Sequence, residues 1–200
     1  MHRDGGAARI VLDRASRRQI GLCRPRHPGW LLPGLLLGVL AASACFWLGS
    51  MLYGAGPGHP FVSIAHNYQL QPTSGWSPLR LHLTFTIAAC LFSPIGEEIF
   101  YRGFLQKVLE DRHGARRATL LEAALFAIVH LCHHGIVLSA AGPVLQGASA
   151  ALWVGQMFLL ALGFAWLRRA SGSLLPAIVA HAAFNAAMNA WIFARLWPQA

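Results

Sequence analysis

Long apolar runs separated by short arginine-rich blocks are the feature that most constrains the fold of this 200-residue sequence. Hydrophobic residues make up 56% of the chain and charged residues only 12%, well outside the balance of a water-soluble domain. The first apolar run, at about residues 30–53, is long enough to cross a hydrocarbon core of ~30 Å at roughly 1.5 Å per helical residue. The sequence therefore predicts an all-α integral membrane protein.

Hydropathy and charge together predict a multi-pass helical bundle of about five transmembrane segments, and the polar residues described below are expected to line an intramembrane active-site cavity inside it. The third segment is short and is expected to continue irregularly to about residue 141. The nearly uncharged stretch 54–77 is rich in glycine, proline, histidine and serine, which is typical of a loop. The expected segments lie at about residues 30–53, 79–102, 119–132, 142–167 and 173–197.

The basic residues set the expected orientation. Sixteen Lys and Arg against seven Asp and Glu give a formal net charge of +9. The basic blocks all fall on one side of the expected topology, as the positive-inside rule requires. Residues 1–28 are therefore expected to form a basic cytoplasmic tail and residues 29–200 a membrane domain, in contact with membrane lipids.

Two broader expectations follow from the same composition. An Arg- and Ala-rich chain with a single Lys is compatible with the inner membrane of a bacterium. Binding to nucleic acid is not expected, because no motif of interleaved aromatic and basic residues accompanies the positive charge.

Two adjacent acids, Glu97 and Glu98, stand at the end of the second apolar run, in the segment GEEIFYRG. Ionisable side chains are costly in hydrocarbon, so they indicate a functional site by default. Glu98 and Arg102 are four residues apart with the acid first, the favoured arrangement for a helical ion pair. Glu97 then points about 100° away on the helix, toward an expected cavity. The alternative is that both acids are solvated at a helix end.

Three further polar residues lie on other predicted segments. His130 ends the run FAIVHL, and His181 and Asn185 lie one helical turn apart in HAAFN. A carboxylate such as Glu97 with a neighbouring His can activate water as a general base, and His and Asn side chains can donate to an oxyanion. The combination favours hydrolysis of a peptide bond, although each histidine taken singly is typical of a hydrogen-bonded core residue.

The run HLCHH extends this cluster by two histidines, His133 and His134. His134 is one helical turn from His130 and would share its face on a continuing helix. One interpretation is that the run supplies an extra proton carrier or a metal ligand. The other is that it forms a turn at the membrane interface.

These motifs resemble those of the CAAX protease and bacteriocin-processing family, which includes the Rce1-like type II prenyl endopeptidases. GEEIFYRG resembles its EExxxR motif, residues 126–130 its FxxxH motif, and residues 181–185 its HxxxN motif, in the family's order. The resemblance covers about residues 85–195. It implies a glutamic-type intramembrane endopeptidase.

The resemblance also implies roles for individual residues. Glu97 and His130 would activate the attacking water. The pair His181 and Asn185 would stabilise the oxyanion, and the pair Glu98 and Arg102 would brace the site. The expected substrate is a protein or peptide near the membrane surface, cleaved in processing or maturation. Whether it carries a prenyl group is left open.

A metal is the alternative to this mechanism, because the family has also been described as metal-dependent. Glu97, His130 and His181 would then be three ligands of a zinc ion with an open fourth position. The sequence has no HExxH helix, and a mechanism without a cofactor is expected.

Two functions without proteolysis compete with this interpretation. In a non-enzymatic membrane scaffold or immunity-type protein, the polar cluster would be structural. In a small proton-coupled transporter, the buried carboxylates and imidazoles would form a proton relay, although about five spans without a repeat leave little room for alternating access.

Overall fold

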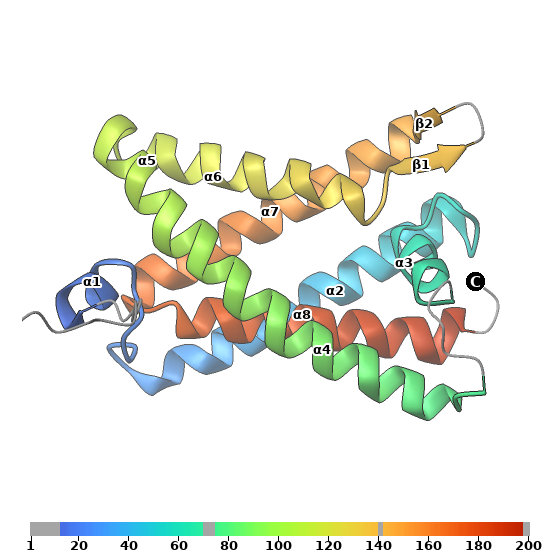
Figure 1. Ribbon diagram of the computed structural model, residues 1–200, viewed down its shortest axis with the longest axis horizontal. Helices are drawn as coiled ribbons and strands as arrows, with labels where there is room; N and C mark the ends of the chain where they lie inside the picture. Colours follow the sequence, from blue (N-terminus) through green and yellow to red (C-terminus); the bar gives the residue numbers. More distant parts are fainter. Residues whose placement is uncertain (1–12, 70–74, 140–141, 198–200) are drawn as a thin grey trace, which may run out of the picture.

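The computed structural model describes residues 13–69, 75–139 and 142–197. Within these ranges the chain is helical apart from one two-stranded hairpin (Figure 1). The α-helices are α1 (Arg14–Gln19), α2 (Leu31–Tyr53), α3 (Pro60–Gln69), α4 (Pro78–Glu98), α5 (Gln106–His113), α6 (Ala115–Val129), α7 (Gly147–Ser171) and α8 (Leu175–Trp191). The shorter elements are the 3₁₀ turns η1 (Pro28–Trp30) and η3 (His130–Cys132), the π-helical segments η2 (Ile99–Leu105) and η4 (Ile192–Leu196), and the antiparallel strands β1 (Ile136–Ser139) and β2 (Gly142–Leu145).

Among the described residues, four helical segments are long and apolar enough to cross a membrane. Large apolar side chains such as Leu40, Phe92 and Leu159 are mostly exposed on their outer surfaces, where a bilayer would cover them. The prediction of a multi-pass α-helical membrane protein is confirmed. The four segments are Pro28–Tyr53, Pro78–His113, Gly147–Ser171 and Leu175–Leu196.

The third expected span corresponds to α6, which is not among these four. α6 has 15 residues, about 22 Å of helix, which is shorter than a hydrocarbon core of ~30 Å. The chain then turns through η3 and Gly135, whose φ of +112° lies where glycine is favoured. The β-hairpin follows, so the next span begins at Gly147 rather than at about residue 142.

The stretch 54–77 is not a simple loop, because it contains α3. Three apolar residues of α3, Phe61, Ile64 and Ala65, are buried in the bundle. Pro60 opens the helix, at a position where its missing N–H costs nothing. This short helix covers one end of the polar interior.

α2 and α8 pack against each other more extensively than any other pair of elements. A Cβ placed on Gly38 would lie 2.1 Å from the carbonyl oxygen of Ala180, and one on Gly34 would lie 2.5 Å from that of Pro176. Glycines four residues apart permit this close approach between membrane helices. α2 thereby sets the position of α8.

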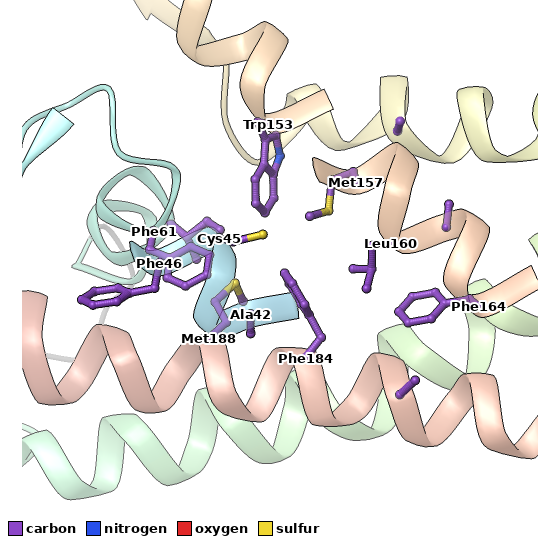
Figure 2. Packing of buried hydrophobic residues seen from close by; sticks show 14 of the residues in the cluster. Ala42, Cys45, Phe46, Phe61, Trp153, Met157, Leu160, Phe164, Phe184 and Met188 are labelled. Carbon is purple, nitrogen blue, oxygen red and sulfur yellow. The ribbon is translucent and has the colours of Figure 1, made fainter. Parts of the chain in front are cut away.

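The apolar core lies where α2, α3, α7 and α8 meet (Figure 2). Trp153 and Met157 of α7 face Phe184 and Met188 of α8 across it, each less than 9% exposed. The residues labelled in Figure 2 are Ala42, Cys45, Phe46, Phe61, Trp153, Met157, Leu160, Phe164, Phe184 and Met188.

The described part of the N-terminal segment is held against the turn between α7 and α8. Leu174 N–H donates to the Gly21 carbonyl at 2.8 Å, and the Ser173 hydroxyl donates to the Cys23 carbonyl at 2.5 Å. Ser173 Oγ also accepts from Leu175 N–H at 3.1 Å, at the start of α8. Residues 1–12 of the expected basic tail lie outside the described residues.

Candidate active site

The two adjacent glutamates enter the bundle at the end of α4. Ser77 Oγ caps the start of this helix by accepting from the Arg80 N–H at 3.3 Å. After Glu98 the helix widens into the π-helical segment η2, a local geometry found frequently at functional sites. Glu97 and Glu98 make different contacts, as the helical spacing predicts.

Glu97 lines an internal cavity and is 29% exposed. The Ser93 hydroxyl, one turn earlier on α4, donates to Glu97 Oε1 at 2.6 Å. The second oxygen, Oε2, lies 3.9 Å from Nε2 of His130. This separation is too long for a direct hydrogen bond. Ser93 therefore holds one carboxylate oxygen while the other faces the imidazole.

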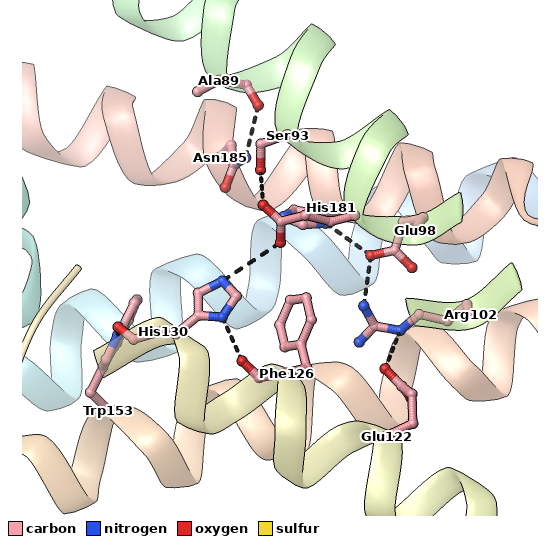
Figure 3. Close-up of polar contacts among 11 residues, drawn as sticks. Ala89, Ser93, Glu98, Arg102, Glu122, Phe126, His130, Trp153, His181 and Asn185 are labelled. Carbon is pink, nitrogen blue, oxygen red and sulfur yellow. Dashed lines mark hydrogen bonds and ion pairs between the residues drawn. The ribbon is translucent and has the colours of Figure 1, made fainter. Parts of the chain in front are cut away.

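The ring of His130 is fixed by a second contact. Its Nδ1 lies 2.7 Å from the carbonyl oxygen of Phe126 (Figure 3). A carbonyl can only accept, so Nδ1 is the donor, and a neutral ring then has no proton on Nε2. Trp153 Nε1–H donates to the carbonyl of His130 at 2.9 Å and ties the end of α6 to α7.

A chain of charged groups lies behind this pair (Figure 3). Arg102 donates through Nη1 to Glu98 Oε1 at 3.0 Å, which is the expected ion pair. The same Glu98 oxygen lies 2.9 Å from His181 Nδ1. On its other side, Arg102 Nε lies 3.3 Å from Oε1 of Glu122 on α6. Glu98, Arg102 and Glu122 are fully buried.

Aromatic rings surround the guanidinium of Arg102. Its central carbon lies 4.1 Å from the ring centroid of Phe126 and 5.1 Å from that of Phe164. Cations positioned in this way are attracted by the π-faces of the rings. The arginine thus joins α6 and α7 to the end of α4.

α8 supplies the remaining predicted residues. Asn185 Nδ2 donates to the carbonyl of Ala89 on α4 at 2.9 Å, and His181 lies one turn earlier on the same face. Asn189, one turn further on, accepts from Tyr68 of α3 at 2.9 Å. His181 and Asn185 line the cavity, whereas Asn189 is fully buried and fastens α3.

The cavity has a volume of about 200 Å³. The four residues predicted as catalytic, Glu97, His130, His181 and Asn185, all line it, although they come from three separate segments. Its remaining wall is mostly apolar, with contributions from Ile64, Trp153, Met157, Leu160, Phe184 and Met188. The sequence-predicted residues therefore meet at one polar face of a largely apolar cavity.

The two histidines of HLCHH separate in the structure. His133 lines the cavity, with its ring centroid 5.4 Å from that of His130. His134 instead bonds Ser63 Oγ at 2.7 Å through Nδ1, and Ser149 through Nε2. The expectation that His134 shares the face of His130 assumed a continuing α-helix, and α6 ends at Val129.

Sequence reasoning missed Asn67 and Tyr68 of α3, which line the cavity, and it missed two further polar residues, Ser93 and Glu122. Both carried a readable signal. Ser93 is one helical turn before Glu97, and Glu122 is an acid within an apolar segment, which by itself suggests a functional site.

The zinc interpretation does not fit the donors. Within the described ranges, no group of three or more His, Cys, Asp or Glu side chains is arranged to hold a metal ion. Glu97, His130 and His181 are not arranged as such a group among the described residues, and the proposal below contains no step through a metal.

The fold and site define a multi-pass helical membrane protein with ionisable side chains gathered in an internal cavity. The family model described as type II CAAX prenyl endopeptidase Rce1-like matches residues 79–187, and the chain belongs to this family. Membership identifies it in general terms as an intramembrane endopeptidase resembling CAAX proteases. No curated protein and no solved structure matches the chain significantly.

Proposed function

We infer that Glu97 and His130 activate a water molecule for attack on a peptide bond. The observation that carries this proposal is the 3.9 Å between Glu97 Oε2 and His130 Nε2, in a cavity large enough to admit a reacting group. Both atoms are acceptors when the glutamate is ionised and the imidazole neutral. One water can donate a proton to each of them, which a separation of this size permits.

The attack then proceeds with a defined transfer of protons. The water oxygen bonds to the carbonyl carbon of the substrate while Glu97 takes one proton as general base. The tetrahedral intermediate collapses when its C–N bond breaks, and the proton on Glu97 passes to the leaving nitrogen. The products are a carboxyl group and an amine, and Glu97 returns to its starting state.

α8 provides the groups that stabilise the oxyanion. Asn185 uses one amide hydrogen to bind the Ala89 carbonyl, and its second hydrogen is available to the cavity. His181 is oriented by Glu98 through Nδ1, and Nε2 can donate to the oxyanion when both ring nitrogens are protonated. Donors aimed at developing charge are typically worth 10²–10³ in rate each.

The walls of the cavity indicate the class of substrate. Apolar residues of α7 and α8, including Met157, Leu160 and Met188, form most of the surface around the polar face. A peptide with apolar side chains beside the scissile bond fits such a wall. The substrate class that follows is a membrane-associated protein or peptide undergoing processing.

The proposal is tested by comparing protein termini in membranes that contain wild type or the Glu97→Ala variant at matched levels. New termini found only with the wild type support proteolysis and reveal the cleaved bond. Identical termini, with both proteins inserted and folded, would contradict the proposal. A membrane scaffold with a structural polar cluster would give that second result.

A further inference from the structure

Glu122 is a fully buried acid that no motif of the sequence singles out. It lies on α6, four residues before Phe126, and its ion-pair partner among the described residues is Arg102, at 3.3 Å. Arg169 of α7 is a further cation that acts on Glu122, and it is itself paired with Glu110. Neither carboxylate oxygen of Glu122 makes a hydrogen bond that meets geometric criteria among the described residues. A buried carboxylate without hydrogen bonds is costly unless an opposite charge compensates it, so its presence here suggests a purpose in the site.

The charges along the buried chain suggest that purpose. In their ionised forms Glu98 and Glu122 each contribute one negative charge, and Arg102, which contacts both, contributes one positive charge. If His181 is neutral, the four residues together would carry one net negative charge. Three of them, Glu98, Arg102 and Glu122, have no solvent exposure. With a doubly protonated His181 the chain is neutral, and buried ions are tolerated when their charges are balanced.

The proposed role of His181 requires the same protonation state. Its Nδ1 lies 2.9 Å from a carboxylate oxygen of Glu98 and donates to it when protonated. To donate also to an oxyanion through Nε2, the ring must carry protons on both nitrogens. A neutral ring with its proton on Nδ1 would present a lone pair to the oxyanion and repel it.

Resting on the function proposed above, we propose that Glu122 is a positioning residue whose negative charge, relayed through Arg102 and Glu98, keeps His181 doubly protonated as an oxyanion donor. Without the negative charge of Glu122, Arg102 and Glu98 neutralise each other. The net charge of the cluster is then zero when His181 is neutral.

Other groups around His181 contribute to its environment. Glu97 of α4 and His130 of η3 line the same cavity, with His133 beside His130. α7 presents Phe164, whose ring centroid lies 5.2 Å from that of His181 in a stacked arrangement. Because all of these remain in a Glu122→Gln variant, that substitution isolates the charge of Glu122.

The test is a nitrogen NMR measurement on the full-length protein in lipid bilayers at neutral pH, with histidine rings labelled with ¹⁵N. The signal of His181 is identified as the one lost in a His181→Gln variant. We expect both ring nitrogens to be protonated in the wild type and in the control Asp111→Asn, an exposed acid paired with Lys107. In Glu122→Gln one of the two becomes unprotonated.

Two results would overturn the proposal. One is a wild-type His181 with a single protonated nitrogen, a result that needs the His181→Gln assignment variant but not Glu122→Gln. The other is an unchanged His181 in a folded Glu122→Gln protein, which would mean that a proton already resides on Glu122. Neither result depends on cleavage, so both are distinguishable from a failure of the proposed peptidase chemistry.

Cleavage supplies a second readout once the scissile bond is known. With a peptide spanning that bond, Glu122→Gln is expected to lower kcat/KM about 100-fold at alkaline pH, with recovery as the pH falls and His181 gains its second proton. A purely structural role would lower the rate equally at every pH, which would contradict the proposal.

Discussion

The hydroxyl of Ser93 lies 2.6 Å from Oε1 of Glu97, one helical turn away on α4. This bond leaves Oε2 directed at His130. Ser93, which also lines the cavity, therefore holds Oε1 and leaves Oε2 as the oxygen proposed to act as the base.

Replacing Ser93 with alanine is expected to lower kcat about tenfold. The reason is the loss of a hydrogen bond to a charged acceptor, worth roughly 1.5–3 kcal/mol, part of which positions the base. Steady-state cleavage of a peptide substrate measures the effect. Ser43→Ala is the control, because Ser43 accepts from Trp191 away from the cavity. Equal rates in the two variants would contradict the role of Ser93.

Asn185 and Asn189 provide a matched pair of amides on consecutive turns of α8. Asn185→Ala is expected to lower kcat about 10²-fold or more, because an oxyanion donor is lost, with little change in KM. Asn189→Ala is expected to retain most of the activity, since its contact is Tyr68 of α3. The separate values of kcat and KM decide between these roles. A larger loss of kcat in Asn189→Ala would mean that the donors are wrongly assigned.

Arg102 is expected to contribute strongly to the stability of the fold. Its replacement by alanine leaves Glu122 buried without its cation and Glu98 without its arginine partner, and removing one partner of a buried pair costs about 3–5 kcal/mol. Thermal unfolding in detergent should show a large loss of stability. Lys107→Ala removes a cation from a solvent-exposed pair with Asp111 and should have little effect. Similar unfolding temperatures for Arg102→Ala and Lys107→Ala would contradict the role given to the buried ion pairs of Arg102.

Gly38 is expected to be sensitive to a single methyl group. Gly38→Ala places a Cβ 2.1 Å from the Ala180 carbonyl, so α2 and α8 must separate, at a cost of about 1–3 kcal/mol. Gly155→Ala on α7 is the matched control, because a Cβ there meets no atom within 4 Å. The unfolding midpoints of the two variants measure the difference. A Gly38→Ala protein as stable as the wild type would contradict the close packing.

The long spans and the helical spacing of residues within each motif were predictable because both depend on local sequence. The pair Glu98 and Arg102 follows from a four-residue helical interval, and Glu97 then lies on another face. The convergence of His130 and His181 could be anticipated only from the resemblance to a family, since the two residues are far apart along the chain.

The elements that sequence reasoning missed depend on tertiary contacts or on breaks in helical geometry. α3 is stabilised by burying Phe61 and Ile64 in a bundle formed by other segments. The separation of His133 from His134 follows from the end of α6 at Val129, which periodicity does not locate. Glu122 is readable from the sequence as an acid in an apolar segment, but its pairing with Arg102 depends on how α6 packs beside the end of α4.

The most direct test of the account is cleavage by the purified protein in liposomes, with a peptide spanning the bond found in host membranes. Wild type and Glu97→Gln are compared, because glutamine keeps the shape of the side chain and cannot accept a proton as a base. The account predicts cleavage by the wild type and a loss of at least ~10³-fold in the variant, with unchanged thermal unfolding. A folded Glu97→Gln protein that cleaves at a rate near that of the wild type would contradict it.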